Sequence, residues 1–144
     1  VAAVMQKRTG KTVQQLVVYR GGTDSSFTDT DDADILACAS LGIVNGVGNG
    51  RFAPDAHITR EQAATMLVRA ASILDIRANR EHTPFNDADR ISTWAKSAVA
   101  EVSAMQTKDG TLVMQGVGSN RFAPSDPYTR EQSIITAYRL FRMK

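Results

Sequence analysis

A seventeen-residue segment occurs twice in this 144-residue chain, and this repeat limits the folds that the chain can adopt. GVGNGRFAPDAHITREQ covers residues 46–62, and GVGSNRFAPSDPYTREQ covers residues 116–132, seventy positions later. Eleven of the seventeen positions are identical, and the two copies align without a gap. Such self-similarity is typical of a fold made of repeated units that bury their apolar faces against one another.

A pattern typical of an amphipathic helix follows each copy. Apolar residues recur at i, i+3, i+4 and i+7 spacing in both places. The members of the two stripes are Ala63, Met66, Leu67, Ala70 and Leu74 after the first copy, and Ile134, Ala137, Tyr138 and Phe141 after the second. Each copy is also preceded by a helical stretch that opens from a Phe-x-Asp turn. We interpret the aspartates of these turns, Asp29 and Asp87, as helix N-caps.

The repeated unit is therefore helix, glycine turn, loop and helix, which predicts an all-α fold. We expect a compact bundle of two to three helix-loop-helix units with short irregular or extended connectors. The tail of a first repeat plus a connector occupies 1–26, the second repeat 27–80 and the third 81–144, all within one compact domain. The tail is inferred because residues 1–10 align with residues 62–71, and residues 14–22 are interpreted as the connector.

Two loop features have structural interpretations. Phe52 and Phe122, in the two Arg-Phe-Ala-Pro segments, are expected to plug the core from a loop. The third repeat contains an insertion in which Asp109-Gly110 predicts a tight turn that leads into an extended stretch.

The Thr-Arg-Glu-Gln at the end of each copy has two interpretations. Its Thr and Gln have the spacing of a capping box, and its Glu suits the positive end of the helix dipole. The arginines of the motif, Arg60 and Arg130, do not suit the positive end of the helix dipole, because a cation at this position is disfavoured by roughly 0.3–1 kcal/mol. Either a nearby carboxylate pairs with each arginine inside the fold, or the guanidinium and the helix-end amides bind an anionic ligand.

Composition argues against several classes of function. The net charge is only +2 and the basic residues are scattered, so nucleic acid is not the expected partner. No apolar stretch approaches the length of a membrane span. Cys38 with His57 or His82 is the single nucleophile–base combination in the sequence. Cys38 lies in an apolar helical segment, which does not favour a reactive thiolate. We therefore expect no catalysis, no cofactor and no metal site.

The acidic run from Asp29 to Asp34 is a weak candidate for a cation site. A calcium-binding EF-hand loop that began at Asp29 would need Gly at the position of Asp34 and Glu at the position of Ser40. We interpret these aspartates as solvated helix caps, with weak surface cation binding as the alternative.

Taken in order, the Phe-x-Asp turn, Trp94, the glycine turn, Phe-x-Pro and Thr-Arg-Glu-Gln resemble the repeats of S-layer homology (SLH) domains. The second copy is the fuller match, whereas the first has a shorter leading helix and no tryptophan. The resemblance implies a helical bundle of three repeats in a pseudo-threefold arrangement, with binding grooves between neighbouring repeats.

The resemblance also implies a function, which is the non-covalent anchoring of a surface protein to a secondary cell-wall polysaccharide that carries pyruvylated amino sugars. The implied ligand-binding residues are Arg60 and Arg130 for the ketal carboxylate, Trp94 for a sugar face, Gly46 and Gly116 for close approach of the sugar, and Asp87 as the support of a groove. It places the chain at the bacterial cell surface, as the C-terminal part of a larger secreted protein. The alternative is a structural or protein–protein interaction module with degenerate grooves, whose partners are other surface proteins.

Overall fold

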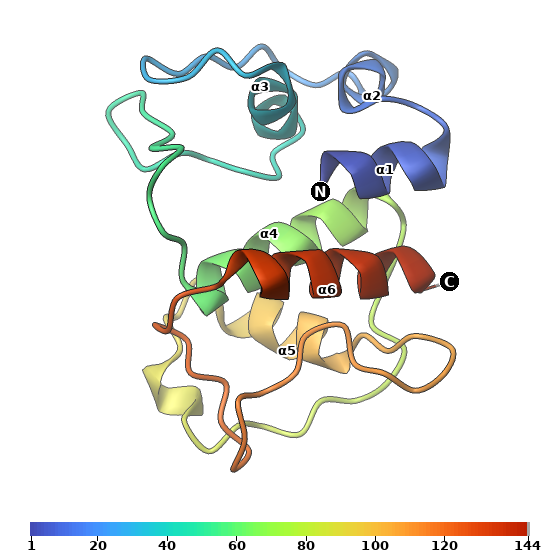
Figure 1. The fold of residues 1–144 in the computed structure, drawn as a ribbon, viewed down its shortest axis with the longest axis vertical. Coiled ribbons are helices and arrows are strands. Elements are labelled where there is room, and N and C mark those ends of the chain that lie inside the picture. Colours follow the sequence, from blue (N-terminus) through green and yellow to red (C-terminus); the bar gives the residue numbers. More distant parts are fainter. Residues whose placement is uncertain (144) are drawn as a thin grey trace. The chain divides into compact units, whose positions relative to one another are not determined.

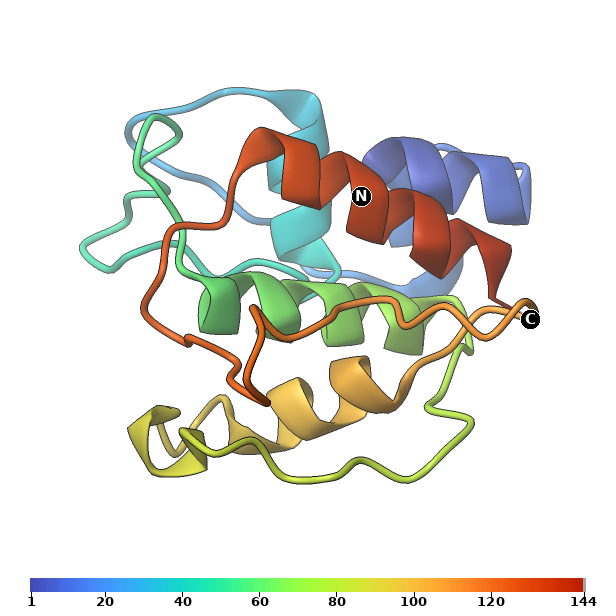
Figure 2. The same ribbon diagram turned by 60° about the horizontal axis from the view of Figure 1, so that its bottom comes forward.

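The structure is a computed structural model that describes residues 1–143. Its regular elements are six α-helices and one short 3-10 helix, and the described residues form no β-strand beyond three isolated bridges. The prediction of an all-α fold is therefore confirmed. Long irregular loops join the helices, as Figures 1 and 2 show. No helix among residues 1–143 is long and apolar enough to cross a membrane.

The chain forms two compact units, of which the first comprises Val1–Ala56 and the second begins at His57. The boundary between them falls inside the range 27–80. The first helix of that range lies in the first unit and its second helix in the second unit. The division into three repeats stays a prediction.

The first unit contains three eight-residue helices, α1 (Ala2–Thr9), α2 (Val13–Arg20) and α3 (Ala33–Ser40) (Figure 1). Helix α2 packs against both α1 and α3. Asp32 is the N-cap of α3, and its carboxylate accepts hydrogen bonds from the amides of Asp34 and Ile35 at 2.9 and 3.0 Å. One of the predicted acidic caps of the run 29–34 is therefore Asp32.

The interpretation of residues 14–22 as a connector was wrong, because α2 covers most of them. Thr12 and Gln15 form a complete capping box, and the helix ends where Gly21 adopts a left-handed conformation with φ of 66°. The Thr-x-x-Gln signal was present in the sequence. It was missed because the eight residues that follow, VQQLVVYR, are rich in valine and lack a marked apolar stripe.

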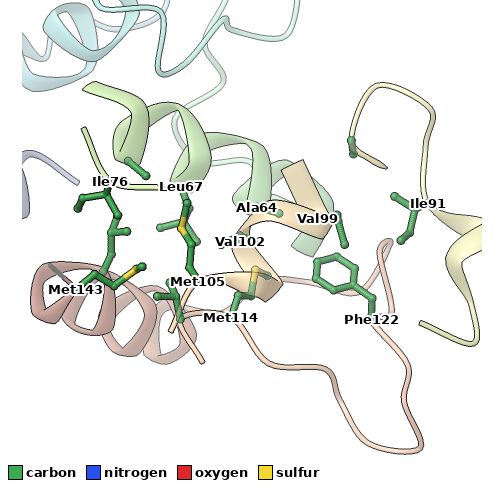
Figure 3. Packing of buried hydrophobic residues seen from close by; sticks show 14 residues of the cluster. Ala64, Leu67, Ile76, Ile91, Val99, Val102, Met105, Met114, Phe122 and Met143 are labelled. Atoms are coloured by element: carbon green, nitrogen blue, oxygen red, sulfur yellow. The ribbon is translucent and has the colours of Figure 1, made fainter. Parts of the chain in front are cut away.

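The second unit contains α4 (Arg60–Ile73), the 3-10 helix η1 (Ala88–Arg90), α5 (Lys96–Ala104) and α6 (Arg130–Arg142). Helices α4 and α5 pack against each other. One buried apolar cluster unites side chains from α4, α5, α6 and the loops (Figure 3). It includes Leu67 from α4, Val99 and Val102 from α5, and the loop residue Phe122, which is fully buried. The prediction that Phe122 plugs the core is confirmed.

The apolar stripe predicted for α6 was partly wrong. Ile134 and Tyr138 are 64% and 58% exposed, whereas Thr136 and Leu140 are buried. On the buried face of α6, Leu140 joins the core cluster. The hydroxyl of Tyr128 hydrogen-bonds to the carbonyl of Gln132 and to the hydroxyl of Thr136 on the same face.

The predicted tight turn at Asp109-Gly110 is present. Gly110, with φ of 87°, donates its amide to the carbonyl of Thr107 at 3.0 Å, and an isolated antiparallel bridge joins Gln106 to Leu112. The Asp109 carboxylate accepts hydrogen bonds from the hydroxyl of Thr107 and from the amide of Thr111. The side chain and backbone bonds together lower the pKa of Asp109 to about 2.

Candidate functional site

The two Arg-Phe-Ala-Pro loops are each held by the aspartate of the preceding Phe-x-Asp turn. Asp87 accepts hydrogen bonds from the amides of Phe122 and Ala123, both at 2.8 Å. Burial opposes the ionisation of Asp87, but these two amides and the nearby Arg121 outweigh that effect and lower its pKa. Ala123 has φ of 56°, a left-handed conformation that alanine seldom adopts, and the aspartate stabilises it through two consecutive amides.

The first loop repeats this geometry in the other unit. Asp29 accepts from the amides of Phe52 and Ala53, again at 2.8 Å, and these bonds, with that from Phe52 as the main cause, lower its pKa. The interpretation of Asp29 as a helix N-cap was therefore wrong. Asp87 does occupy the N-cap position of η1, but its side chain makes no capping bond there. Both reach loop amides more than twenty residues away in the chain, a distance that local sequence patterns do not reveal.

The glycines that open the loops are required by internal packing. A Cβ atom on Gly116 would lie 2.5 Å from the carbonyl oxygen of Arg121 and 3.1 Å from the Phe85 ring. A Cβ atom on Gly46 would meet the carbonyl oxygen of Arg51 at 2.5 Å. Gly46 also has φ of 72°, whereas Gly116 is not in the left-handed region. This packing explains both glycines without a ligand, and their contact with a sugar stays a prediction.

Arg60, the first residue of α4, lies inside the second unit with only 4% of its surface exposed. Its Nε donates to the carbonyl of Phe122 at 2.8 Å, and its Nη2 donates to the carbonyl of Gln115 at 2.7 Å. The guanidinium carbon lies 4.9 Å from the centre of the Phe122 ring, within cation–π distance. Burial is the main cause that lowers the pKa of Arg60. Backbone carbonyls of the second loop, and not a carboxylate, thus receive this arginine.

The backbone amides at the start of α4 are also occupied. The amide of Arg60 donates to the carbonyl of Asp126 at 3.0 Å, and that of Glu61 donates to the carbonyl of Pro124 at 3.1 Å. The amide of Gln62 donates to the hydroxyl of Thr59, which completes the predicted capping box. These three bonds leave α4 without free amides for an anion at its first turn.

Glu61, the next residue, holds a second segment of the same unit. Its side chain is largely buried, and its two carboxylate oxygens accept hydrogen bonds from the amide and the hydroxyl of Ser92 at 2.9 and 2.8 Å. Ser92 begins a four-residue turn that closes with a 2.8 Å bond from the amide of Ala95 to the carbonyl of Ser92. The start of α4 thus contacts both the loop with Phe122 and the turn before α5.

Trp94 is the third residue of that turn and is 57% exposed. Its neighbours Ile91 and Ala95 are 7% and 0% exposed, so the turn is fastened to the core on both sides of the tryptophan. An indole ring that projects from a fixed turn offers a flat apolar face of the kind that stacks on a ligand ring.

Arg130, the first residue of α6, has the same place in its motif as Arg60 but is exposed. Thr129 and Gln132 form the predicted capping box around it. Among the residues that the structure describes, none forms a hydrogen bond or ion pair with the Arg130 side chain. Its guanidinium is therefore open to an anion from solvent.

The structure brings four of the six predicted ligand-binding residues to one region of the second unit. Arg60, Asp87 and Gly116 converge on the loop with Phe122, and Trp94 lies on the turn that Glu61 holds. The region continues at Gln115, whose carbonyl accepts from Arg60. Of the other two predicted residues, Gly46 belongs to the first unit. Arg130 begins α6, four residues after Asp126, whose carbonyl accepts from the amide of Arg60. The contact of Glu61 with Ser92 was not foreseen, since the glutamate was attributed to the helix dipole alone.

The residues considered for catalysis lie apart in the chain and in different surroundings. Cys38 is buried in α3, and burial raises the pKa of its thiol, which disfavours the reactive thiolate. His82 stacks on Phe85 with ring centres 4.8 Å apart, and burial lowers its pKa. His57 is exposed in the second unit. None of these observations supports a nucleophile–base pair.

Comparison with known proteins gives a consistent family. A family model described as S-layer homology domain matches residues 26–64. The chain is similar to an endoglucanase of Bacillus sp. (strain KSM-635), with 39% identity over 102 residues, which are 69% of this chain and 10% of that protein. It is 30% identical to exoglucanase XynX of Acetivibrio thermocellus over 139 residues, which are 92% of this chain and 12% of that protein.

The chain is also similar to a surface-layer 125 kDa protein of Lysinibacillus sphaericus, with 30% identity over 101 residues, 70% of this chain and 8% of that protein. The chain thus spans about a tenth of the length of the curated relatives that it matches. No solved structure gives a significant match.

Proposed function

We propose that this chain, which matches the S-layer homology domain over residues 26–64, is an anchoring module that binds an anionic cell-wall polysaccharide and catalyses no reaction. S-layer homology domains anchor surface proteins to the bacterial cell wall, and the chain accordingly belongs at the bacterial cell surface. The two glucanases are similar to it over only 10% and 12% of their length, so their activities are not transferred to this segment.

The exposure of Trp94 is the observation that carries the proposal. The phenylalanine rings of the same unit are buried or half-buried, whereas this indole ring is 57% exposed on a turn with buried neighbours. An exposed tryptophan loses the free energy of burial, which is roughly 1.5–3 kcal/mol for a large apolar side chain. Stacking on the apolar face of a sugar would recover part of that free energy.

The ligand that we propose is a polysaccharide with pyruvylated amino sugars, because a ketal carboxylate is an anion suited to a guanidinium. Arg130 is the arginine that we assign to this carboxylate, since its side chain is exposed. A polymer presents successive sugars and carboxylates, so Trp94 and Arg130 need not contact the same sugar residue. Direct contact of Arg60 with the glycan stays a prediction, because its guanidinium already donates to two carbonyls of the unit.

A calorimetric titration of the purified chain with two polymers tests this function. One polymer is pyruvylated wall polysaccharide and the other is the same polymer from which the ketal has been removed by mild acid. We expect heat of binding with the first and at least tenfold weaker binding with the second. Equal affinity for both polymers would exclude the carboxylate as the recognised group.

A module that contacts other proteins is the second candidate. The outward face of α6 supports it, because Ile134, Ile135 and Tyr138 are 64%, 47% and 58% exposed. If a folded sample gives no heat with either polymer, this second function replaces the first.

A further inference from the structure

We propose that Glu61 is a positioning residue for the sugar-binding tryptophan and acts on Trp94 through Ser92. The inference rests on the proposed function, in which Trp94 is the platform for a sugar, and extends it to a residue on a different helix. Glu61 belongs to α4 and Trp94 precedes α5, thirty-three positions later in the chain.

The geometry is specific because the carboxylate of Glu61 makes two bonds to one residue. Oε2 accepts from the amide of Ser92 at 2.9 Å, and Oε1 accepts from the Ser92 hydroxyl at 2.8 Å. Two bonds from a planar carboxylate fix both the position and the direction of the residue that they hold. Ser92 opens the turn that contains Trp94, so the turn cannot rotate without breaking at least one of them.

The turn has no comparable support from its own helix. The residue that precedes α5, Ala95, offers no side-chain cap, and its amide is used to close the turn onto the carbonyl of Ser92. Ile91 and Ala95 fix the ends of the turn in the core, and Glu61 supplies its polar restraint. The cost of a carboxylate that is only 8% exposed is offset by these two charge-assisted bonds.

A fixed tryptophan binds more tightly than a mobile one because less conformational entropy is lost when a ligand orders it. The free energy of ordering one such side chain corresponds to an affinity change of roughly 3- to 10-fold. Glu131, the residue of α6 that corresponds to Glu61, is exposed and provides a control for the motion of Trp94.

The experiment compares the wild-type chain with Glu61→Ala, Ser92→Ala and the control Glu131→Ala. The chain contains a single tryptophan, so its time-resolved fluorescence anisotropy reports on Trp94 alone. In folded Glu61→Ala we expect faster local depolarisation and a 3- to 10-fold loss of affinity for pyruvylated polysaccharide. Ser92→Ala, which keeps the amide donor, should show a smaller change in the same direction, and Glu131→Ala should keep the anisotropy of the wild type.

Unchanged anisotropy in both Glu61→Ala and Ser92→Ala would overturn the inference, as would faster motion without loss of affinity. If Glu61→Ala does not fold, the anisotropy and the affinity of Ser92→Ala test the inference in its place. If the wild type itself does not bind the polysaccharide, the proposed function and the affinity part of the inference both fail. The anisotropy of the variants would then still show whether Glu61 holds the tryptophan.

Discussion

The starts of α4 and α6 have the same four residues and the same capping box, yet their arginines lie in opposite surroundings. Arg60 is 4% exposed and donates to the carbonyls of Gln115 and Phe122, whereas Arg130 is exposed. The Thr and Gln of the motif therefore start the helix through contacts within the motif itself. The environment of the arginine depends instead on which loop packs over it. One motif serves internal packing at one position and leaves a free cation at the other.

The largest expected effect comes from removal of the buried arginine. Arg60→Ala breaks two charge-assisted hydrogen bonds and a cation–π contact, and it leaves two carbonyls without this donor. We expect the free energy of unfolding to fall by about 4 kcal/mol. Arg130→Ala should change it by less than about 0.5 kcal/mol. Urea unfolding of both variants measures the difference, and equal losses would remove the distinction between the two sites.

The two aspartates that hold the loops offer a second comparison. Asp87→Ala would leave the amides of Phe122 and Ala123 without their acceptor in a buried loop, with an expected loss of about 3 kcal/mol. Asp29→Ala should lose clearly less, because Phe52 and Ala53 are only half-buried and water can replace the carboxylate. Unfolding monitored by circular dichroism provides both values. A larger loss for Asp29→Ala would contradict this ranking.

The two capping threonines should behave alike, in contrast to the arginines. Thr59→Ala and Thr129→Ala each remove one hydrogen bond to the amide of a glutamine, at 3.3 and 3.2 Å. We expect each substitution to lower the free energy of unfolding by about 1 kcal/mol. Thermal melting of the two variants at one pH tests this. A loss confined to one variant would show that the two helix starts differ in more than their arginines.

The smallest expected effect is a dependence of stability on pH that the turn at Asp109-Gly110 adds. Asp109 has a folded pKa of about 2, below the ordinary value of 3.8, so its contribution is complete above the unfolded pKa. The contribution is lost as the pH falls through about 4 to about 2. Asp29 and Asp87, whose pKa values are also lowered, act in the same direction.

A series of melting temperatures from pH 7 to pH 2 should therefore be flat at first and fall below about pH 4. In Asp109→Asn the fall should be shallower. Identical pH profiles for Asp109→Asn and the wild type would mean that the turn carries no such linkage.

Local patterns were sufficient for the helices with strong start signals. The capping boxes at Thr59 and Thr129 were predicted from four residues each, and both formed as expected. The turn at Asp109-Gly110 was likewise predicted from its dipeptide. In each case the atoms that bond are fewer than five residues apart, so the signal and its partner share one short window.

The long-range contacts of the site were not predictable from the sequence in the same way. Arg60 reaches Phe122 across 62 positions, and Glu61 reaches Ser92 across 31. The helix dipole was a sufficient local explanation for Glu61, whereas two explanations were open for Arg60. Only the packing of α4 against the segments that contain Ser92 and Phe122 selects their partners. For α6, the buried face likewise depends on tertiary packing, because Leu140 joins the core cluster while Ile134 is exposed.

The measurement that tests the central claim most directly is the titration of Arg130→Ala and wild-type chain with pyruvylated polysaccharide, each accompanied by its melting curve. The account predicts at least tenfold weaker binding by the variant at an unchanged melting temperature, because the exposed guanidinium contacts the ligand and not the fold. An Arg130→Ala variant that is folded and binds as tightly as the wild type would contradict the account.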